Sequence, residues 1–183
     1  MIRFLDILLS SMGLFVLFPL LITIYIIALL DTGAPLYRQE RVGRYKQPFI
    51  LIKFRTMRRN TISVASHLAD ATAITRLGHF LRRNKLDEIP QFWNVLRGEM
   101  SLVGPRPGLR NQSDLTAARE KLDVFAVCPG ITGLAQINDI DMSTPELLAE
   151  TDARMISEMS VRNYFKYIFL TFIGKGSGDR IKS

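Results

Sequence analysis

The sequence predicts an α+β protein: a small membrane-associated α/β domain that follows a proline-broken N-terminal membrane helix and carries a β-hairpin and interfacial amphipathic helices. Three observations lead to this fold class. Residues 7–30 contain no charged side chain. Residues 36–42 and 49–54 are apolar, β-prone runs separated by turn-forming residues. Beyond residue 74, several segments repeat apolar residues at helical spacing.

The chain has 183 residues, which suits one compact domain with an appendage. We expect a membrane helix over 1–30, a main domain over 31–173 and a flexible tail over 174–183. The formal net charge of +7 favours anionic partners, such as polyanions, anionic lipid or phosphorylated small molecules. Cys128 is the single cysteine, so no intrachain disulfide can form, and beside Pro129 it is expected to be a small apolar residue rather than a nucleophile.

As one helix, residues 7–30 would be roughly 36 Å long, enough to cross a bilayer core of about 30 Å. Pro19 divides this segment into 7–18 and 20–30, each too short to cross alone. The helix therefore either spans the bilayer with a kink or is re-entrant, breaking at Pro19 and returning to the same side. Chain physics alone favours the kinked span. Positive charges place the C-terminal flank on the cytoplasmic side: Arg38, Arg41, Arg44 and Lys46.

The runs 36–42 and 49–54 predict a β-hairpin close to the membrane surface. Its far end is basic, with Lys53, Arg55, Arg58 and Arg59. These cations either contact a substrate or form an ordinary charge run that faces solvent and lipid headgroups. Residues 60–69 are expected to form a mobile loop. His67 and His79 are expected to be structural or surface residues, because neither has a second histidine or cysteine at metal-binding spacing.

The stretch 82–98 places two adjacent carboxylates, Asp87 and Glu88, before a short amphipathic helix. Asp87 is expected to be the N-cap, and Pro90 fits the first turn. Gly98 is expected to end the helix. One face is expected to be buried, because apolar residues recur at i, i+3, i+4 and i+7: Ile89, Phe92, Trp93 and Leu96.

The helix N-terminus and the neighbouring cations Arg82, Arg83 and Lys85 favour the charged form of a carboxylate at this position. An ionised, fixed carboxylate beside cations suits a nucleophile or a metal ligand with an anionic substrate alongside. The alternative is that Asp87 and Glu88 only cap the helix, which is a common role for acidic residues at helix starts.

Two further loops are candidate phosphate sites. After a short strand at 100–103, Pro105 and Pro107 fix the backbone on either side of Arg106. Such an arginine loses little freedom on gripping a phosphate or a planar base, although a plain solvent-exposed turn is an equal alternative. The second loop, 129–136, is glycine-rich but matches neither a P-loop nor a dinucleotide fingerprint.

The remaining helices are predicted by apolar spacing. A helix of two to three turns is expected near 74–83, a polar surface helix over 111–127 and a further helix over 145–166. The aromatic cluster at 164–173 either lies in the membrane interface or packs in the core.

Five motifs, in this order, resemble those of monotopic phosphoglycosyl transferases, the bacterial sugar transferase family. They are Lys53-Phe54-Arg55-Thr56-Met57, Leu86-Asp87-Glu88-Ile89-Pro90-Gln91, Asn94-Val95-Leu96-Arg97-Gly98-Glu99-Met100-Ser101, Val103-Gly104-Pro105-Arg106-Pro107 and Pro129-Gly130-Ile131-Thr132-Gly133-Leu134-Ala135-Gln136. Each motif is weak alone, but their order and spacing, together with a proline-containing membrane helix, make the resemblance strong. It extends from about residue 3 to about residue 171.

The resemblance implies transfer of a phosphosugar from a UDP-sugar to undecaprenyl phosphate, giving undecaprenyl-diphospho-sugar and UMP, as the first membrane step of bacterial glycan assembly. It implies Mg²⁺, and a ping-pong path through a covalent phosphosugar on Asp87, with Glu88 as its metal-associated partner. The resemblance also suggests substrate-binding residues: Arg82, Pro105, Arg106, Pro107, Lys53, Arg55 and Gln136.

The resemblance further implies a re-entrant helix with both ends cytoplasmic, reversing the preference from chain physics. The enzyme would then lie in the bacterial inner membrane, with its catalytic domain over 31–173 on the cytoplasmic face and in contact with membrane lipid. A homodimer is compatible with the sequence. Nucleic acid is not an expected partner, because the sequence carries no recognised nucleic-acid-binding motif.

Several positions depart from the family pattern. Phe18 replaces the serine that usually precedes the membrane proline. Cys128 stands where the family often has a basic residue, and Asp139-Ile140 stand where it commonly has a Gly-Arg pair. Met155 and Tyr164 stand where a tyrosine and an aspartate are usual. These changes suggest an altered sugar preference, and the sequence does not name the sugar. The competing hypothesis is a membrane-anchored basic binding or scaffold protein without transferase activity.

Overall fold

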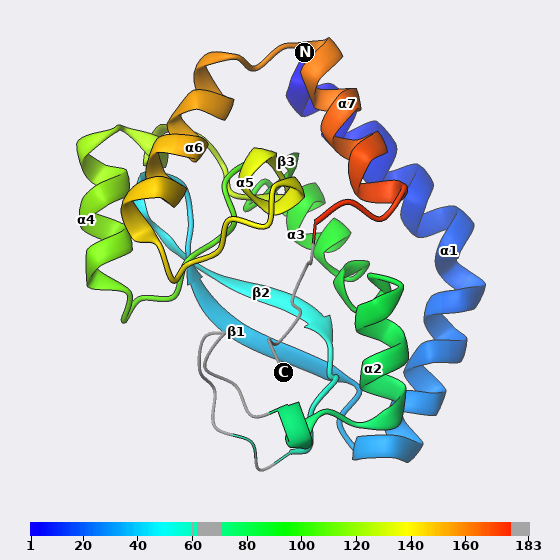
Figure 1. The fold of residues 1–183 in the computed structure, drawn as a ribbon. Helices are drawn as coiled ribbons and strands as arrows, with labels where there is room; N and C mark the ends of the chain where they lie inside the picture. Colours follow the sequence, from blue (N-terminus) through cyan, green and yellow to red (C-terminus); the bar gives the residue numbers. More distant parts are fainter. Residues whose placement is uncertain (60, 62–70, 177–183) are drawn as a thin grey trace.

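The computed structural model describes residues 1–59, 61 and 71–176. Most of the expected loop at 60–69, including His67, lies outside these residues, as does the tail beyond residue 176. The fold mixes helices with two separate two-stranded sheets (Figure 1). In chain order its helices and strands are α1 (Ile2–Thr32), β1 (Leu36–Val42), β2 (Pro48–Phe54), α2 (Arg76–Arg83), α3 (Gln91–Arg97), β3 (Ser101–Val103), α4 (Ser113–Lys121), β4 (Gly130–Thr132), α5 (Leu134–Ile137), α6 (Pro145–Ser157) and α7 (Val161–Phe172).

Helix α1 continues through Pro19 without interruption and is long and apolar enough to cross a membrane. It bends near its middle, so its two halves point in different directions (Figure 1). Of the two forms expected, a helix kinked at Pro19 or one broken there, the structure shows a single bent helix that includes both 7–18 and 20–30. Proline permits this because it removes one hydrogen bond and leaves the rest of the helical ladder intact.

Both ends of α1 pack on the rest of the protein. Near its start, the Arg3 guanidinium donates hydrogen bonds to the carbonyl oxygens of Val95 at 2.6 Å and Leu96 at 3.0 Å. A cation at the C-terminal end of α3 adds hydrogen bonds to the last carbonyls of the helix and complements the helix dipole. Near its other end, Ile24 and Ala28 are buried; Ile24 packs with Phe54 of β2 and Leu81 of α2.

The hairpin forms as the sequence predicts. β1 and β2 are antiparallel, with Tyr37 opposite Lys53, Gln39 opposite Leu51 and Arg41 opposite Phe49. Directly opposed residues share a face of the sheet, and this face is the inner one, because all of these residues except Tyr37 are buried. Three polar side chains therefore point inwards from a two-stranded sheet: Gln39, Arg41 and Lys53.

A side chain takes the place of a third strand beside β2. Asn94 of α3 is fully buried, its Nδ2 donates to the Ile50 carbonyl at 2.7 Å, and its Oδ1 accepts from the Ile52 N–H at 3.1 Å. This satisfies two backbone groups on the edge of the sheet. The hairpin is thereby fixed against the helix that follows the two candidate carboxylates.

The short strand predicted at 100–103 is β3, and it pairs in parallel with β4. The sequence read residues 129–136 as a loop, but they form β4 and the short helix α5. Gly130 is explained by packing, since a Cβ there would collide with the backbone of Gly104. The two backbone segments approach each other more closely than a side chain at Gly130 would allow.

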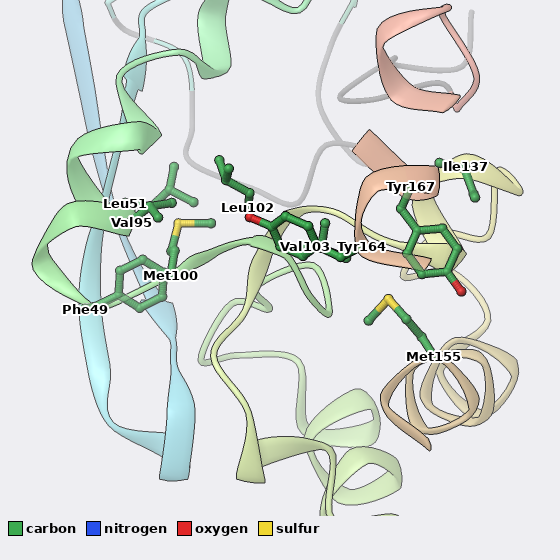
Figure 2. Close-up of a cluster of buried hydrophobic side chains, with 10 residues drawn as sticks. All are labelled: Phe49, Leu51, Val95, Met100, Leu102, Val103, Ile137, Met155, Tyr164 and Tyr167. Atoms are coloured by element: carbon green, nitrogen blue, oxygen red, sulfur yellow. The ribbon is translucent and has the colours of Figure 1, made fainter. Parts of the chain in front are cut away.

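The main core joins the hairpin, α3, β3 and the three C-terminal helices. Its buried members, shown in Figure 2, are Phe49, Leu51, Val95, Met100, Leu102, Val103, Ile137, Met155, Tyr164 and Tyr167. Met155 and Tyr164, two of the departures from the family pattern, are both fully buried here. Burial of this apolar surface provides the principal driving force for the arrangement.

Two helices differ from expectation. The helix expected over 111–127 is shorter, because α4 ends at Lys121. The helix expected over 145–166 is two helices, α6 and α7, and Ser160 caps the second by accepting from the Asn163 N–H at 3.2 Å. Serine at this position competes well with helix continuation, because its hydroxyl satisfies a first-turn donor.

The aromatic cluster at 164–173 is divided between two faces of α7, one packed in the core and one exposed. Tyr164 and Tyr167 are buried in the core, whereas Phe165, Phe169 and Phe172 are exposed. The spacing of three to four residues separates the two sets around the helix.

Candidate functional site

The two adjacent carboxylates lie on a tight turn rather than at a helix cap. Leu86–Glu88 form one 3₁₀ turn, and Pro90, not Asp87, is the N-cap position of α3. Lys85, just before this turn, has a φ of 55°, a left-handed conformation that is unusual for a residue with a side chain. Strained conformations of this kind persist only where the surroundings hold them, and they are common at functional sites.

The turn points its two carboxylates into different surroundings. Asp87 is only 2% exposed. Glu88 lines a pocket of about 300 Å³ between the hairpin, α3 and the loop after β3. The polar residues of the pocket are Arg41, Lys53, Glu88, Gln91 and Arg106, and its remaining walls are Leu51, Pro107, Gly130 and Ile131. The pocket thus combines one carboxylate with three cations. Asp87 precedes Glu88 on the same turn but is not among the residues that line the pocket.

Arg106 faces Glu88 across this pocket. Its Nη2 lies 3.9 Å from Glu88 Oε1, and both side chains are largely shielded from solvent. Charges in such a partly desolvated cleft interact more strongly than on an open surface. Lys53, on strand β2 of the hairpin, adds a further positive charge to the pocket. Its Nζ lies 5.9 Å from the ring centre of Tyr37.

The loop that carries Arg106 is held through its own carbonyl groups. Four successive carbonyl oxygens accept hydrogen bonds from four separate donors. Backbone N–H groups bind the two outer carbonyls: Gly130 donates to Pro105 at 2.8 Å, and Val42 donates to Gly108 at 3.0 Å. Arginine side chains bind the two inner ones: Arg119 Nη1 donates to the Arg106 carbonyl and Arg41 Nη1 to the Pro107 carbonyl, each at 2.9 Å. The two prolines have no N–H of their own. The backbone on both sides of Arg106 is therefore fixed, and its side chain is presented to the pocket.

Behind this loop lies a buried ion pair between α4 and α6. Arg119 donates from Nε and Nη2 to Asp152 Oδ2, at 3.0 Å and 2.7 Å. Arg119 is 3% exposed and Asp152 is fully buried. Burial raises the pKa of the Asp152 carboxyl, and the adjacent Arg119 charge opposes that rise.

The structure brings only part of the predicted substrate-binding set into this pocket. Lys53, Arg106 and Pro107 line it, but the other four predicted residues do not. Arg82 donates to Thr56 Oγ1 at 2.8 Å. Arg55 donates to the Ala34 carbonyl at 2.9 Å and lies over the ring of Tyr37. Both arginines are therefore beside the hairpin's basic end.

Pro105 and Gln136 are also placed elsewhere. Pro105 lines a second hollow, of about 220 Å³, behind the loop. The side-chain amide of Gln136 is buried on α5, with no hydrogen-bond partner in the part of the chain that the structure describes.

Sequence reasoning missed Arg41, Gln91, Arg119 and Asp152. Arg41 was assigned only to the positive flank of the membrane helix, yet strand alternation places it on the same face as Phe49 and Leu51, and this was a usable signal. Gln91 stands in a quoted motif but was given no role. The contact of Arg119 with Asp152 joins residues 33 positions apart on separate helices, so no local pattern indicates it.

The donor set fits Mg²⁺ only with help from a substrate. Within residues 1–59, 61 and 71–176, no three side chains among histidine, cysteine, aspartate and glutamate cluster as a metal cage. Mg²⁺ is commonly held by one or two carboxylates together with substrate phosphates and water. Asp87 and Glu88 match that limited contribution from the protein.

Many large apolar side chains are exposed outside the pocket. Large apolar side chains are exposed along α1 and on helices that contact it, with Phe80 on α2, Trp93 on α3 and Phe165, Phe169 and Phe172 on α7. The expectation that Trp93 belongs to the buried face of its helix was wrong, since it is 53% exposed and Gln91, Asn94 and Val95 are buried instead. Exposed apolar side chains on neighbouring helices are typical of surfaces that contact a membrane or a partner.

Several known proteins are similar to this chain in sequence. Residues 1–175 match the family described as bacterial sugar transferase. A UDP-galactose-lipid carrier transferase of Erwinia amylovora is 35% identical over 173 residues, covering 85% of this chain and 36% of that protein. A UDP-glucose:undecaprenyl-phosphate glucose-1-phosphate transferase of Escherichia coli (strain K12) is 38% identical over 176 residues, covering 91% of this chain and 38% of that protein.

A third relative is closer in length. The uncharacterised sugar transferase EpsL of Bacillus subtilis (strain 168) is 37% identical over 153 residues, covering 83% of this chain and 75% of that protein. This chain thus spans little more than a third of the Erwinia and Escherichia proteins. With the family match covering nearly its whole length, the chain belongs to the bacterial sugar transferase family.

Proposed function

We propose that this chain transfers a phosphosugar from a UDP-sugar to undecaprenyl phosphate, in two steps through a covalent phosphosugar on Asp87. The observation that carries the proposal is the pocket in which Glu88 meets Arg41, Lys53 and Arg106, directly beside the buried Asp87 on one fixed turn. The names of the Erwinia and Escherichia relatives support a sugar nucleotide as donor and a lipid carrier as acceptor.

In the first step, a carboxylate oxygen of Asp87 attacks the phosphorus that bears the sugar. A new carboxylate O–P bond forms, the P–O bond to UMP breaks, and UMP leaves with the bonding electron pair. The cations of the pocket reduce the repulsion between the carboxylate and the diphosphate and stabilise charge on the departing phosphate. Arg106 and Lys53 have the positions for this role.

In the second step, a phosphate oxygen of the lipid attacks the same phosphorus, and the Asp87 carboxylate leaves. The product is undecaprenyl-diphospho-sugar, and the free carboxylate is regenerated. Covalent catalysis allows one small site to serve a soluble donor and a lipid acceptor in turn. The low exposure of Asp87 limits access of water, which would otherwise hydrolyse the acyl phosphate.

Mg²⁺ fits this proposal with Asp87 and Glu88 as the residues that would hold it. When bound, it would neutralise charge on the diphosphate of the donor. Glu88 lies in the pocket lining, where such an ion and a phosphate would both be within reach.

We also propose that α1 is re-entrant, so that the catalytic domain lies on the cytoplasmic face of the bacterial inner membrane. Residues near both ends of the helix contact the same domain: Arg3 reaches α3, while Ile24 packs against β2 and α2. A helix that crossed the bilayer would carry one of these ends to the opposite side. The bend near Pro19 supports a path that enters and leaves through one leaflet (Figure 1).

The decisive test is the variant Asp87→Asn. We expect it to fold normally and to lose UMP release from UDP-sugar, because an amide is a poor nucleophile. Wild-type protein without acceptor should release one equivalent of UMP from its cognate UDP-sugar and gain the mass of one phosphosugar on Asp87. A panel of UDP-sugars identifies the donor.

Two controls make the result interpretable. The exposed Asp114 on α4 lies outside the pocket lining, so Asp114→Asn should transfer sugar at the wild-type rate. The circular dichroism and thermal unfolding of Asp87→Asn should match the wild type within a few degrees. Full transfer activity in folded Asp87→Asn would exclude the proposed mechanism.

A further inference from the structure

We propose that Arg119 and Asp152 are positioning residues for the transfer reaction: the pair holds the backbone of Arg106 so that its side chain is aimed at the donor. This inference rests on the proposed function, since it concerns the same pocket. It assigns a role to a buried charge pair that contributes no side chain to the pocket itself.

Each of the three guanidinium nitrogens of Arg119 has a fixed partner. Nε and Nη2 bind the same oxygen of Asp152, at 3.0 Å and 2.7 Å, and Nη1 reaches the Arg106 carbonyl at 2.9 Å. The guanidinium is planar and its donors form a rigid fork. Because Asp152 fixes the plane of this fork, it also fixes the direction of the remaining Nη1–H bond.

Stability alone is a weak explanation of this pair. Replacing a buried ion pair with apolar residues of similar volume is often neutral or stabilising. Asp152 is fully buried, and its Oδ1 has no hydrogen-bond partner among the described residues, which makes the pair expensive to keep. The unusual feature is the third bond, to the carbonyl of Arg106, whose guanidinium faces Glu88.

The loop needs donors from outside because its prolines supply none. Arg41 makes the equivalent bond to the Pro107 carbonyl, but Arg41 also lines the pocket, so its substitution would mix two effects. Arg119 lines the hollow behind the loop and is not among the residues that line the pocket. Its substitution therefore reaches the pocket through the loop backbone.

The test is a double-mutant cycle between Arg119→Lys and Arg106→Ala. Lysine retains the charge that pairs with Asp152 but cannot keep all three hydrogen bonds. We expect Arg119→Lys to raise the KM for the UDP-sugar about tenfold, to leave the KM for undecaprenyl phosphate within twofold, and to retain wild-type secondary structure. In the Arg106→Ala background, the same substitution should change kcat/KM by less than about twofold, because its effect acts through Arg106.

Asp152→Asn is a second variant that should change the same parameter. It keeps the shape of the side chain and weakens its hold on the guanidinium, so the donor KM should rise while the acceptor KM stays constant. The matched control is Arg154→Lys on the same helix α6, where the arginine is exposed and pairs with Glu158. This control should leave both KM values unchanged.

The outcomes separate the two hypotheses. An active wild type in which Arg119→Lys lowers kcat/KM equally with and without Arg106 would overturn the positioning role and leave a structural one. Loss of thermal stability with unchanged KM values in Arg119→Lys would overturn it as well. A wild type that releases no UMP from any UDP-sugar would instead overturn the proposed function on which the inference rests.

Discussion

The Asp6 carboxylate in the first turns of α1 accepts a hydrogen bond from the Tyr164 hydroxyl of α7 at 2.8 Å, across 158 positions of sequence. The same oxygen accepts from the Ser101 hydroxyl at 3.0 Å and the Leu102 N–H at 2.9 Å. Asp6 is 2% exposed. Burial and this hydrogen bond raise the pKa of Tyr164, so its hydroxyl remains protonated and can donate.

This relationship predicts an ordered series of stability losses. Asp6→Ala leaves three donors buried without an acceptor and should cost about 3 kcal/mol or more, whereas Tyr164→Phe removes one bond and should cost about 1 kcal/mol. Thermal unfolding in detergent micelles, followed by circular dichroism, measures both. Equal midpoints for the wild type and Asp6→Ala would contradict the importance of this network.

Removal of divalent metal should stop transfer. With only Asp87 and Glu88 as expected protein ligands, Mg²⁺ should bind the free protein weakly, at roughly millimolar concentration, and more tightly when a UDP-sugar is present. We expect EDTA to lower UMP release more than 100-fold and added Mg²⁺ to restore it. Calorimetric titration with and without donor tests the predicted coupling; tight binding without donor would argue for a complete metal cage.

The exposed face of α7 should contact lipid. Phe169 is 61% exposed, so Phe169→Asp should preserve the core yet lower the partition of the protein into anionic liposomes several-fold. Leu122→Asp is a matched control, because Leu122 is also exposed and lies just beyond α4. Liposome flotation measures both variants, and equal partition would show that α7 does not lie in the membrane.

Cys128 should be a slow nucleophile. Burial raises the pKa of its thiol above the ordinary value, and the nearby Arg44 and Arg3 charges offset this only in part. At pH 8 the thiolate fraction is therefore lower in the folded protein than in the unfolded chain. Iodoacetamide should alkylate the folded protein at least several-fold more slowly, with a rate that still rises above pH 9, as mass spectrometry can follow.

A control separates reactivity from function at this cysteine. Cys128→Ser should keep sugar transfer within about twofold of the wild type and lose all alkylation. Rapid labelling of folded protein at pH 7 would show that the thiol is exposed and ionised, contrary to its surroundings in the structure.

Local patterns predicted the elements of this fold where one segment determines its own structure. The hairpin at 36–42 and 49–54 was predictable from β-prone runs around a turn, and Gly98 does end α3 in a left-handed conformation. The apolar spacing around Trp93 was misleading, because α3 exposes Trp93 and buries the amides of Gln91 and Asn94. Asn94 is buried for its bonds to β2.

The site was predictable only in part, because local patterns do not show which distant segments meet. The turn with Asp87 and Glu88 and the loop with Arg106 are local motifs, and each could be recognised from its own residues. Their proximity depends on the pairing of β3 with β4 and on Arg119, whose partner Asp152 lies on another helix. Such contacts between distant segments have no signature in a single sequence.

The network around Asp6 also constrains the order of events during synthesis. The three partners of Asp6 are synthesised 95, 96 and 158 residues after it. At a translation rate of about 5–20 residues per second, the acid waits roughly ten seconds or more for Tyr164. Until α7 is synthesised, the Asp6 carboxylate lacks the hydroxyl of Tyr164 as a donor. A product that terminates before residue 164 therefore lacks the hydrogen bond that joins α1 to α7.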